Sequence, residues 1–540
     1  MKRVWMVWGA ALLVGLWAVV AAAWAAEDLA ISFEDTTEQS GIVWEVLPKD
    51  PGVVKPGVAY MGWEFDVFLF DADGDGHADI VSPSHHANER QPGGLWLGRG
   101  DGTFGPNTMD KQPIVDEAGK PAPIAAAYGV GVDLDGDGRL DFVCVEHWGY
   151  YLSRGVEGTG EGRVVKFTAY KSGGWRTWVL GDFNRDGKLD VARNAELLLG
   201  SGKGTHPNQW KQQAQTTAEF KKWADTTQYG VLHQAVGADF DRDGDVDLLV
   251  SPSLLGKGRT EPRPRLLLYI NDGAGGFTEC AEKMGIVGGP PQGAIVAADL
   301  NNDGYFDIVA TGRGNGTDDL KRRIVLYVNE GGKKFTAKDP AASGLQIADT
   351  ADYNITYSSG LAVDFDNDGL LDVVIGDALS GYRVFRNLGD FRFQAVAVLR
   401  PGARMARPAS ADINEDGLMD LIVNEGRRGL TIYTNRSKNA NGWIELAVRG
   451  PEGNLSGVGS LVEVFRPGKF GDRSALLAMQ HVCAENDNHV PLAPHFGLGK
   501  EPAADVRVTF PGGKTAEARG VKANTRIFAD FETGKVAEKK

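Results

Sequence analysis

A nine-residue acidic loop recurs seven times between residues 71 and 420. Every copy has Asp at positions one, five and nine, Asp or Asn at position three, and Gly at position six. Each copy leads into a short apolar run, which predicts that a β-strand follows the loop. The copies begin at Asp71, Asp133, Asp182, Asp239, Asp299, Asp364 and Asp412. A chain with this many equivalent units is expected to fold as a repeated β architecture.

The spacing of the acidic residues suits a hard cation. Alternate residues of a tightly curled loop can direct their oxygens at one centre, and Ca²⁺ takes about 6–8 oxygen ligands. Gly at position six permits a sharp turn. Position seven varies freely, as expected if only its backbone carbonyl binds. An EF-hand would end with Glu at position twelve and continue as a helix, whereas these loops end with Asp at position nine. The sequence therefore predicts up to seven structural calcium ions.

The predicted ligands occupy positions one, three, five, seven and nine of each loop. In the first four loops they are Asp71, Asp73, Asp75, His77, Asp79, Asp133, Asp135, Asp137, Arg139, Asp141, Asp182, Asn184, Asp186, Lys188, Asp190, Asp239, Asp241, Asp243, Asp245 and Asp247. In the last three they are Asp299, Asn301, Asp303, Tyr305, Asp307, Asp364, Asp366, Asp368, Leu370, Asp372, Asp412, Asn414, Asp416, Leu418 and Asp420. Loops with Asn at position three carry one negative charge fewer, so we expect them to bind calcium more weakly.

The intervals between loops match the size of propeller blades. Consecutive loops begin 48 to 65 residues apart, and a four-stranded blade needs about 40–50 residues plus insertions. The last unit lacks a fourth strand, but residues 33–42 match the fourth-strand segment 277–286 in the spacing of Phe, Glu and Gly. We therefore expect residues near 31–36 to close the ring within the seventh blade. The predicted fold is all-β, a seven-bladed β-propeller with calcium loops followed by a small C-terminal β domain.

The loops and the Phe-Gly turns resemble FG-GAP, or VCBS, repeats of the integrin-α-type propeller. The propeller is expected over residues 27–436, a separate β domain over 437–534 and a tail over 535–540. The segment His495-Phe-Gly-Leu-Gly499 resembles the ASPIC/UnbV domain that follows such propellers in the cartilage acidic protein family. The stretch beginning at Gln480 departs from the pattern of that domain.

The N-terminus and the charge indicate the compartment and the class of partner. Lys2 and Arg3 precede an uncharged stretch to Ala26, so residues 1–26 are predicted to be a signal peptide and the protein to be secreted or periplasmic. An uncleaved anchor is the alternative. A net charge of −15 gives no field for nucleic acid, and no membrane association is expected beyond the signal peptide. Three cysteines allow at most one disulfide.

The face opposite the calcium loops is the predicted ligand surface. Segments placed there by the repeat are rich in aromatic, His and Arg residues. The candidates are Trp63, His85, His86, His147, Trp148, Tyr150, Trp175, Arg176, His233, Arg313, Tyr357 and Arg404. Rings can stack on sugars, and Arg can pair with carboxylate or sulfate, so an extracellular glycan or a protein is the expected partner. The alternative for any one ring is packing between blades.

The interpretation that this sequence favours is a non-catalytic binding propeller whose oligomeric state is left open. A lyase-type, polysaccharide-active enzyme is the second hypothesis, with His147, Tyr150 and Arg176 as candidate catalytic residues. A third hypothesis is an envelope or matrix scaffold, in which the aromatic face meets another protein. The C-terminal domain is expected to be an accessory module.

Overall fold

A computed structural model provides the fold. It describes residues 31–46, 59–61, 67–82, 93–111, 114–122, 129–144, 149–171, 178–193, 196–212, 234–251, 266–287, 294–311, 324–346, 359–377, 381–399, 408–424, 430–482, 484–485 and 493–539. The predicted signal peptide lies outside these residues. Within them, no helix is long and apolar enough to cross a bilayer.

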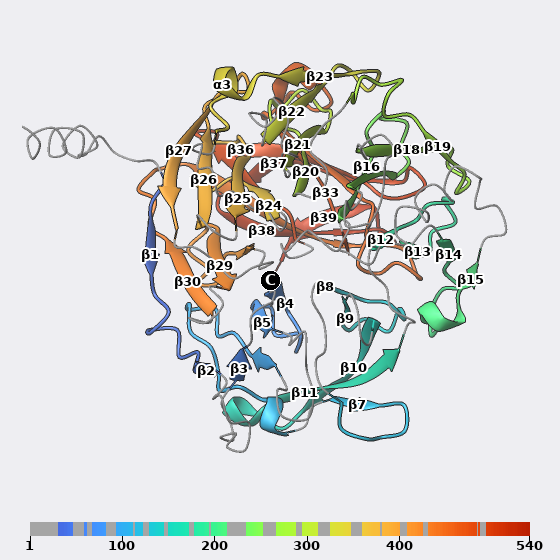
Figure 1. The fold of residues 1–540 in the computed structure, drawn as a ribbon, viewed down its shortest axis with the longest axis vertical. Coiled ribbons are helices and arrows are strands. Elements are labelled where there is room, and N and C mark those ends of the chain that lie inside the picture. The colour runs from blue at the N-terminus through green and yellow to red at the C-terminus, as the bar shows by residue number, and fades with distance from the viewer. Residues whose placement is uncertain are drawn as a thin grey trace, which may run out of the picture.

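Seven small sheets are arranged around a central axis (Figure 1). In each sheet the acidic loop connects the first strand to the second, and the second strand begins at the Asp of position nine. The first strands of neighbouring sheets contact one another around the ring, as for β4 (Phe68–Phe70) with β8 (Gly129–Val132) and β16 (Gln234–Ala238) with β20 (Ile295–Ala298). First strands therefore line the centre, and the predicted seven-bladed propeller is confirmed.

The first three sheets differ most from the four-stranded pattern. Sheet one contains β4, β5 (Asp79–Ser82) and β6 (Gly94–Trp96). Sheet two contains β8, β9 (Asp141–Cys144), β10 (Gly149–Glu157), β11 (Val164–Lys171) and β7 (Ile114–Asp116). Sheet three contains β12 (Trp178–Gly181), β13 (Asp190–Arg193), β14 (Glu196–Leu199), β15 (Lys211–Gln212) and the added strand β34 (Ala484–Glu485).

The other four sheets are antiparallel and four-stranded. Sheet four contains β16, β17 (Asp247–Ser251), β18 (Leu267–Asn271) and β19 (Phe277–Glu279). Sheet five contains β20, β21 (Asp307–Thr311), β22 (Ile324–Asn329) and β23 (Phe335–Lys338). Sheet six contains β24 (Ser359–Val363), β25 (Asp372–Asp377), β26 (Gly381–Asn387) and β27 (Phe393–Val398). Sheet seven contains β28 (Ala409–Ala411), β29 (Asp420–Asn424), β30 (Leu430–Asn435) and β1 (Phe33–Asp35).

The remaining elements are short. A parallel pair is formed by β2 (Trp44–Val46) and β3 (Ala59–Met61). One α-helical turn is α3 (Pro340–Ser343). The 3-10 turns are η1 (Met109–Lys111), η2 (Gly160–Gly162), η3 (Pro207–Gln209) and η6 (Arg473–Ala475).

The N-terminal strand supplies the outer strand of sheet seven. Phe33 of β1 pairs with Asn435 of β30, and Asp35 pairs with Tyr433. The hydroxyl group of Thr36, which follows β1, is hydrogen-bonded to that of Thr434 in β30 at 2.6 Å. This pairing gives β30 a partner on its outer side, and the short strand β1 becomes the edge strand of the sheet.

Apolar side chains form the core between adjacent sheets. One cluster joins Phe70 of sheet one to Phe142 and Tyr151 of sheet two. The Phe142 and Tyr151 rings are stacked, with centroids 4.1 Å apart. Fully burying one such aromatic side chain contributes about 1.5–3 kcal/mol. Stability therefore depends on each sheet having both of its neighbours.

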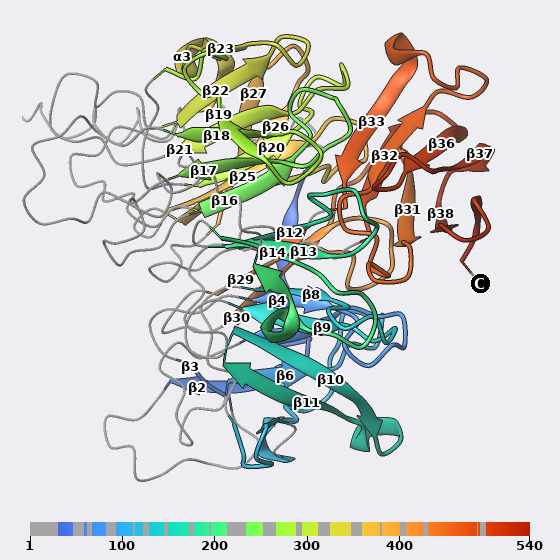
Figure 2. The same cartoon turned by 90° about the vertical axis from the view of Figure 1, so that its right-hand side faces the viewer.

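Residues after Asn439 form one eight-stranded sheet, which we call the C-terminal sheet. Its order is β33 (Leu476–His481), β32 (Leu461–Phe465), β36 (Ala503–Thr509), β37 (Thr515–Lys522), β39 (Lys535–Glu538), β38 (Thr525–Asp530), β31 (Gly442–Arg449) and β35 (His495–Gly499). It lies on one side of the ring (Figure 2). Phe465 and Met479 share a hydrophobic cluster with Phe306 of the ring. The C-terminal sheet is therefore packed against the propeller.

A short strand from this part of the chain joins the ring itself. Ala484 and Glu485 of β34 pair with Leu180 and Val179 of β12, the first strand of sheet three. The same strand contacts β8 and β16. Since first strands surround the axis, β34 adds a strand on the central side of sheet three. This stretch lies in the part of the chain that departs from the ASPIC/UnbV pattern.

Candidate metal centres and the surface that covers them

All seven acidic loops share one backbone conformation. The residue at position four has a positive φ in every copy, between 55° and 78°, and the Gly at position six has a φ between 80° and 96°. Only glycine enters this region without cost. The position-four residues are Gly74, Gly136, Arg185, Arg242, Asn302, Asn367 and Glu415. Gly marks position six in every copy, whereas no single residue type marks position four.

Backbone hydrogen bonds fix the carboxylates at both ends of the loop. In the first loop Asp71 Oδ2 accepts from the amide of Gly76 at 2.9 Å. Asp79 accepts from Ala72 at 2.8 Å through Oδ2 and from Gly98 at 2.7 Å through Oδ1. The same bonds recur in the sixth loop, where Gly369 donates to Asp364 at 2.8 Å. The carboxylates are therefore oriented by the main chain.

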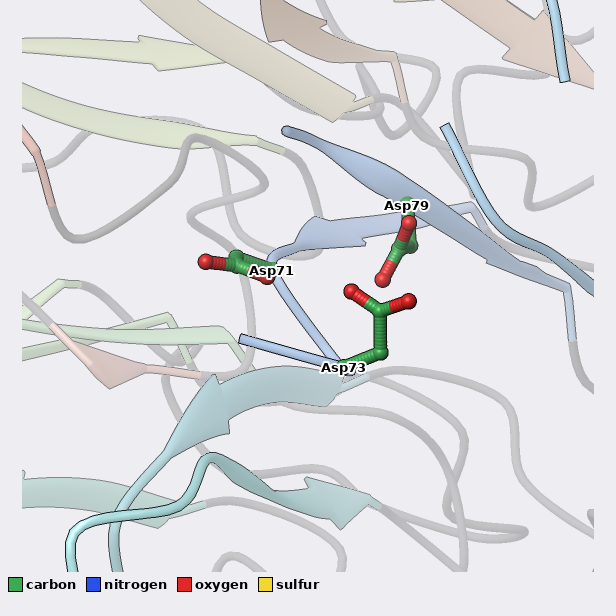
Figure 3. A group of neighbouring side chains, drawn as sticks. All are labelled: Asp71, Asp73 and Asp79. Carbon is green, nitrogen blue, oxygen red and sulfur yellow. The ribbon is translucent and has the colours of Figure 1, made fainter. Parts of the chain in front are cut away.

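The carboxylates at positions one, three and nine converge in the four all-Asp loops. One oxygen from each of the three side chains lies within 4.8 Å of the others. Figure 3 shows the group formed by Asp71, Asp73 and Asp79. The other groups are Asp133, Asp135 and Asp141; Asp239, Asp241 and Asp247; and Asp364, Asp366 and Asp372. The remaining three loops have Asn at position three and offer an amide oxygen there. These clusters can hold a metal ion.

The electrostatics of the loops favour a bound cation. Burial raises the pKa of Asp133 and Asp239 to about 6, and that of Asp190 to about 8. Asp135 Oδ1 and Asp366 Oδ1 are buried without a hydrogen-bond partner. Buried carboxylates are stable when paired with a cation or a donor. The donor set is oxygen only, which fits a hard cation such as Ca²⁺.

Arginine side chains form ion pairs with acidic residues of several loops. Arg163 contacts Asp73 at 2.7 Å in the first loop, and Arg386 contacts Asp366 at 2.7 Å in the sixth. Arg526 comes from the C-terminal sheet and reaches Glu415 at 2.9 Å in the seventh loop. These guanidinium groups reduce the repulsion between the loop carboxylates.

Four of the position-four side chains connect neighbouring loops. Arg185 of loop three donates to the carbonyl of Asp243 in loop four at 2.9 Å. Further along the ring the links are Asn302 to the carbonyl of Gly369 at 2.8 Å, Asn367 to the carbonyl of Gly417 at 2.8 Å, and Glu415 to His77 Nδ1 at 2.8 Å. Loops five, six, seven and one are therefore joined in one continuous arc.

A second set of links joins loops through the third strands of sheets four to seven. Asn329 donates through Nδ2 to the carbonyl of Phe240 in the preceding loop at 2.9 Å and to that of Phe306 in its own loop at 3.1 Å. The equivalent residues in the other sheets are Asn271, Asn387 and Asn435. Each of these asparagines also donates its backbone amide to the position-nine Asp of its own loop. In sheets one to three the residues that donate this backbone hydrogen bond are Gly98, Ser153 and Gly200.

The C-terminal sheet rests on the acidic-loop face. Gly499 donates its amide to the carbonyl of Asn367 at 2.8 Å, and His495 Nε2 lies 2.8 Å from Asn367 Oδ1. A side chain at Gly497 would meet Asp364 Oδ2 at 2.0 Å. Burial lowers the pKa of His495 to about 3, so its ring is neutral. Residues 495–499, which carry the ASPIC/UnbV resemblance, thus form the contact with loop six.

Other contacts extend this interface around the ring. Ser456 accepts from the amide of Asp133 at 2.8 Å, and Arg242 of loop four forms an ion pair with Glu463 at 3.0 Å. These contacts could not be predicted from the sequence, because the partners are hundreds of residues apart.

Most candidates for the opposite face lie outside the described residues. They are Trp63, His85, His86, His147, Trp148, Trp175, Arg176, His233, Arg313, Tyr357 and Arg404. Tyr150 is described and is fully buried. Its hydroxyl lies 2.7 Å from His206 Nδ1, and its ring stacks on Tyr170 with centroids 5.1 Å apart. Burial raises the pKa of Tyr150 further above its ordinary value. Tyr150 therefore takes the packing role, the alternative stated above for such rings.

The predicted position-seven residues differ in what their side chains contact. Lys188 turns back to Asp186 at 3.0 Å, and Arg139 pairs with Asp137. Asp245 is buried and pairs with Arg185 of the preceding loop. None of these contacts requires the position-seven side chain to be a ligand.

Known families and proteins match this chain in part. FG-GAP-like repeats match residues 133–192, 239–310 and 364–423. Cartilage acidic protein 1 of Mus musculus and of Xenopus tropicalis are each 28% identical to the chain over 280 residues. The match covers 51% of this chain and 33% of each relative. The chain thus spans about a third of the length of these curated relatives.

Solved structures with a similar fold include a lectin and a lyase. The Agrocybe aegerita lectin, described as recognising non-reducing terminal N-acetylglucosamine, has a TM-score of 0.39 and 19% identity, with 63% of this chain and 81% of the lectin covered. A rhamnogalacturonan lyase of Bacillus licheniformis has a TM-score of 0.34 and 15% identity, with 70% and 74% covered. Similarity at this level does not assign a ligand.

Each matched repeat segment begins at one acidic loop and ends just after the next. Six of the seven loops are included in this way. The chain is a seven-bladed β-propeller. Three of its segments match FG-GAP-like repeats, and it is similar over 280 residues to cartilage acidic protein 1.

Proposed function

We propose that this protein is an exported propeller that binds Ca²⁺ in its acidic loops and an extracellular glycan or protein on the opposite face, without catalysis. The observation that carries the calcium assignment is the convergence of buried carboxylates at positions one, three and nine. Ca²⁺ accepts flexible shells of oxygen ligands, whereas Mg²⁺ demands octahedral geometry and keeps several waters. Zn²⁺ prefers nitrogen and sulfur ligands.

Calcium in this role is structural. The loops connect the two inner strands of every sheet, and the links from Arg185, Asn302 and Asn367 reach the next loop. Ions that neutralise the buried carboxylates would hold these connections in place. Loss of the ions would leave several like charges close together, which destabilises the ring.

The ligand surface is proposed on the face opposite the loops. The C-terminal sheet lies over the loops through Ser456, Glu463 and Gly499, which supports the other face as the binding surface. The aromatic, His and Arg residues predicted there suit an acidic glycan or a protein. Export is proposed from the signal-peptide pattern in residues 1–26.

Two measurements test the proposal. Chelated protein is titrated with Ca²⁺ and with Mg²⁺ by calorimetry, and its melting temperature is followed; we expect tight binding and a higher melting temperature with Ca²⁺ only. Calcium-loaded protein is then incubated with neutral and acidic polysaccharides and with extracellular protein extracts. Bound but intact polymer, or a captured protein, is the expected result. Shortened polysaccharide would show that the protein is an enzyme.

A further inference from the structure

A cleft between loops six and seven and the C-terminal sheet has the features of a small-molecule site. Its volume is about 700 Å³, within the range of about 300–1,000 Å³ that is typical of ligand pockets. The ring contributes Asn367, Asp416 and Leu418, and the start of the C-terminal sheet contributes Trp443. The cleft exists only because the C-terminal sheet packs on the loops. It lies on the loop side of the ring, separate from the ligand face proposed above.

Trp443 is placed in this cleft as a partly exposed ring. Along β31 the neighbouring residues Ile444 and Leu446 enter the core of the C-terminal sheet, whereas Trp443 points to the other side. Its indole stacks on His495 with centroids 5.6 Å apart. A methyl group at Gly417 would lie 1.9 Å from its Nε1, so the ring fits closely against loop seven. The indole ring of Trp443 is therefore held in position by both the propeller and the C-terminal sheet.

In three asparagine side chains of the cleft, one of the two polar atoms of the amide forms a hydrogen bond within the protein. Asn439 Oδ1 accepts from the amide of Asn441 at 2.9 Å, and Asn524 Oδ1 accepts from the amide of Trp443 at 3.3 Å. Asn441 donates through Nδ2 to the carbonyl of Asp366 at 2.8 Å. These bonds orient the amides. Among the described residues, the second polar atom of each amide can therefore bind a ligand. These atoms are the donors Nδ2 of Asn439 and Nδ2 of Asn524 and the acceptor Oδ1 of Asn441.

The carboxylates of the cleft are engaged by other groups. Glu501 is paired with Arg466. Asp416 accepts hydrogen bonds from Leu418 at 2.9 Å and from Asn414 at 3.0 Å, and it is one of the proposed Ca²⁺ ligands of loop seven. Lys500 lines the cleft as an exposed cation. A single exposed lysine gives little selection for a phosphate, a sulfate or a uronic acid over a neutral ligand.

We propose that this cleft binds a neutral sugar. One face of the half-buried Trp443 ring is stacked on His495, and its other face would take the apolar face of a pyranose, while the oriented amides would donate to and accept from the hydroxyl groups of the sugar. The volume is large enough for a small saccharide. Since its parts come from loops six and seven and from the C-terminal sheet, the site requires both.

The test uses the full calcium-loaded chain and two isosteric variants. Asn439→Asp and Asn524→Asp keep the Oδ1 acceptors that fix Asn441 and Trp443, but each removes the Nδ2 donor. Asn208→Asp makes the same change at an exposed amide in η3, outside the cleft. Binding of glucose, galactose, mannose, N-acetylglucosamine, cellobiose and lactose is measured by saturation-transfer NMR and calorimetry. Equal melting temperatures verify that the variants are folded.

We expect at least one of these sugars to bind, and each cleft variant to weaken that binding about tenfold, the effect of one lost hydrogen bond. Asn208→Asp should bind as the unmodified protein does. Failure of all six sugars to bind would overturn the proposal. Sugar binding that both cleft variants retain would also overturn it, because that sugar would then bind elsewhere on the protein.

Discussion

Asn367 donates a hydrogen bond from its side-chain amide to the carbonyl oxygen of Gly417 at 2.8 Å. The turn of loop six is thereby tied to the turn of loop seven. The Oδ1 of the same amide faces Nε2 of His495 at 2.8 Å. Because Oδ1 can only accept, the neutral imidazole must carry its proton on Nε2. One hydrogen-bonded chain therefore runs from the C-terminal sheet through two acidic loops.

The first prediction concerns the two side-chain hydrogen bonds of Asn367. Asn367→Gly keeps the left-handed backbone, as Gly74 does in loop one, but removes both side-chain bonds. We expect a loss of about 2–3 kcal/mol, since Asn367 is buried and its partners are left unpaired. Thermal unfolding in excess calcium measures the effect. Asn302→Gly is the matched control: it removes one loop-to-loop bond without touching the C-terminal sheet, and should cost about half as much. Equal melting temperatures for Asn367→Gly and unmodified protein would contradict the expected role.

Gly497→Ala should separate the C-terminal sheet from loop six. The added methyl would lie 2.0 Å from Asp364 Oδ2 and 2.5 Å from the backbone of Asn367, so the interface must open. Trypsin cleavage after the exposed Lys438, followed by mass spectrometry, should accelerate severalfold. Gly162→Ala, where a methyl group meets no atom within 4 Å, should leave the cleavage rate unchanged. An unchanged rate in Gly497→Ala would show that this contact does not hold the sheet in place.

The links in sheets four to seven lead to a third prediction. Asn329→Ala removes the donors to Phe240 and Phe306 and the acceptor of Gly332. These groups are buried, so we expect a loss of about 3 kcal/mol in a urea or thermal unfolding experiment. Ser153→Ala changes the equivalent place in sheet two, where no such link exists, and should cost less than about 1 kcal/mol. Similar losses in the two variants would argue against a special role of the asparagine.

Without calcium, stability should fall as the pH rises. Burial raises the pKa of Asp412 to about 7 and that of Asp420 to about 8. A carboxyl group with a higher pKa in the folded protein binds its proton more tightly there. The stability that such a group adds to the folded protein is therefore fully present below about pH 4, and it is lost as the pH rises through the pKa of the group in the folded protein. In a chelator, the melting temperature should decrease from pH 5 to pH 8. Saturating Ca²⁺ should remove or reverse this trend, and a rising melting temperature in chelator would contradict it.

The ranking of the calcium sites is the fifth prediction. Asn301→Asp adds a charge at position three of loop five and should tighten that site severalfold, whereas Asp241→Asn should weaken the site in loop four by a similar factor. Calorimetric titration of the two variants against the unmodified protein measures both changes. The ranking fails if Asp241→Asn leaves every affinity unchanged.

The sequence predicted the ring because its signals are local and repeated. Seven acidic loops, their spacing and the match between Phe33 and Phe277 were enough to place the blades and the outer strand of sheet seven. The convergence of Asp133, Asp135 and Asp141 follows from the same local geometry.

What the sequence did not reveal are contacts between distant segments. The contact of Gly497 with Asp364, the pairing of Ala484 with Leu180 and the links from Asn302 and Asn367 depend on which sheets become neighbours. The left-handed position four is filled by Gly, Arg, Asn or Glu, so no single residue type marks it. Tyr150 illustrates the same limit, since an aromatic residue at a strand end is compatible with both a binding face and the core.

The hydrogen bond between Thr36 and Thr434 joins residues 398 positions apart, which has a consequence for biosynthesis. A nascent chain cannot seal its ring until residue 434 has left the ribosome. Until then, segment 31–36 has no partner strand, and β30 is not yet made. Ring closure is therefore a late event, and a truncated chain lacking either end would present open strand edges to chaperones, proteases or another copy of itself.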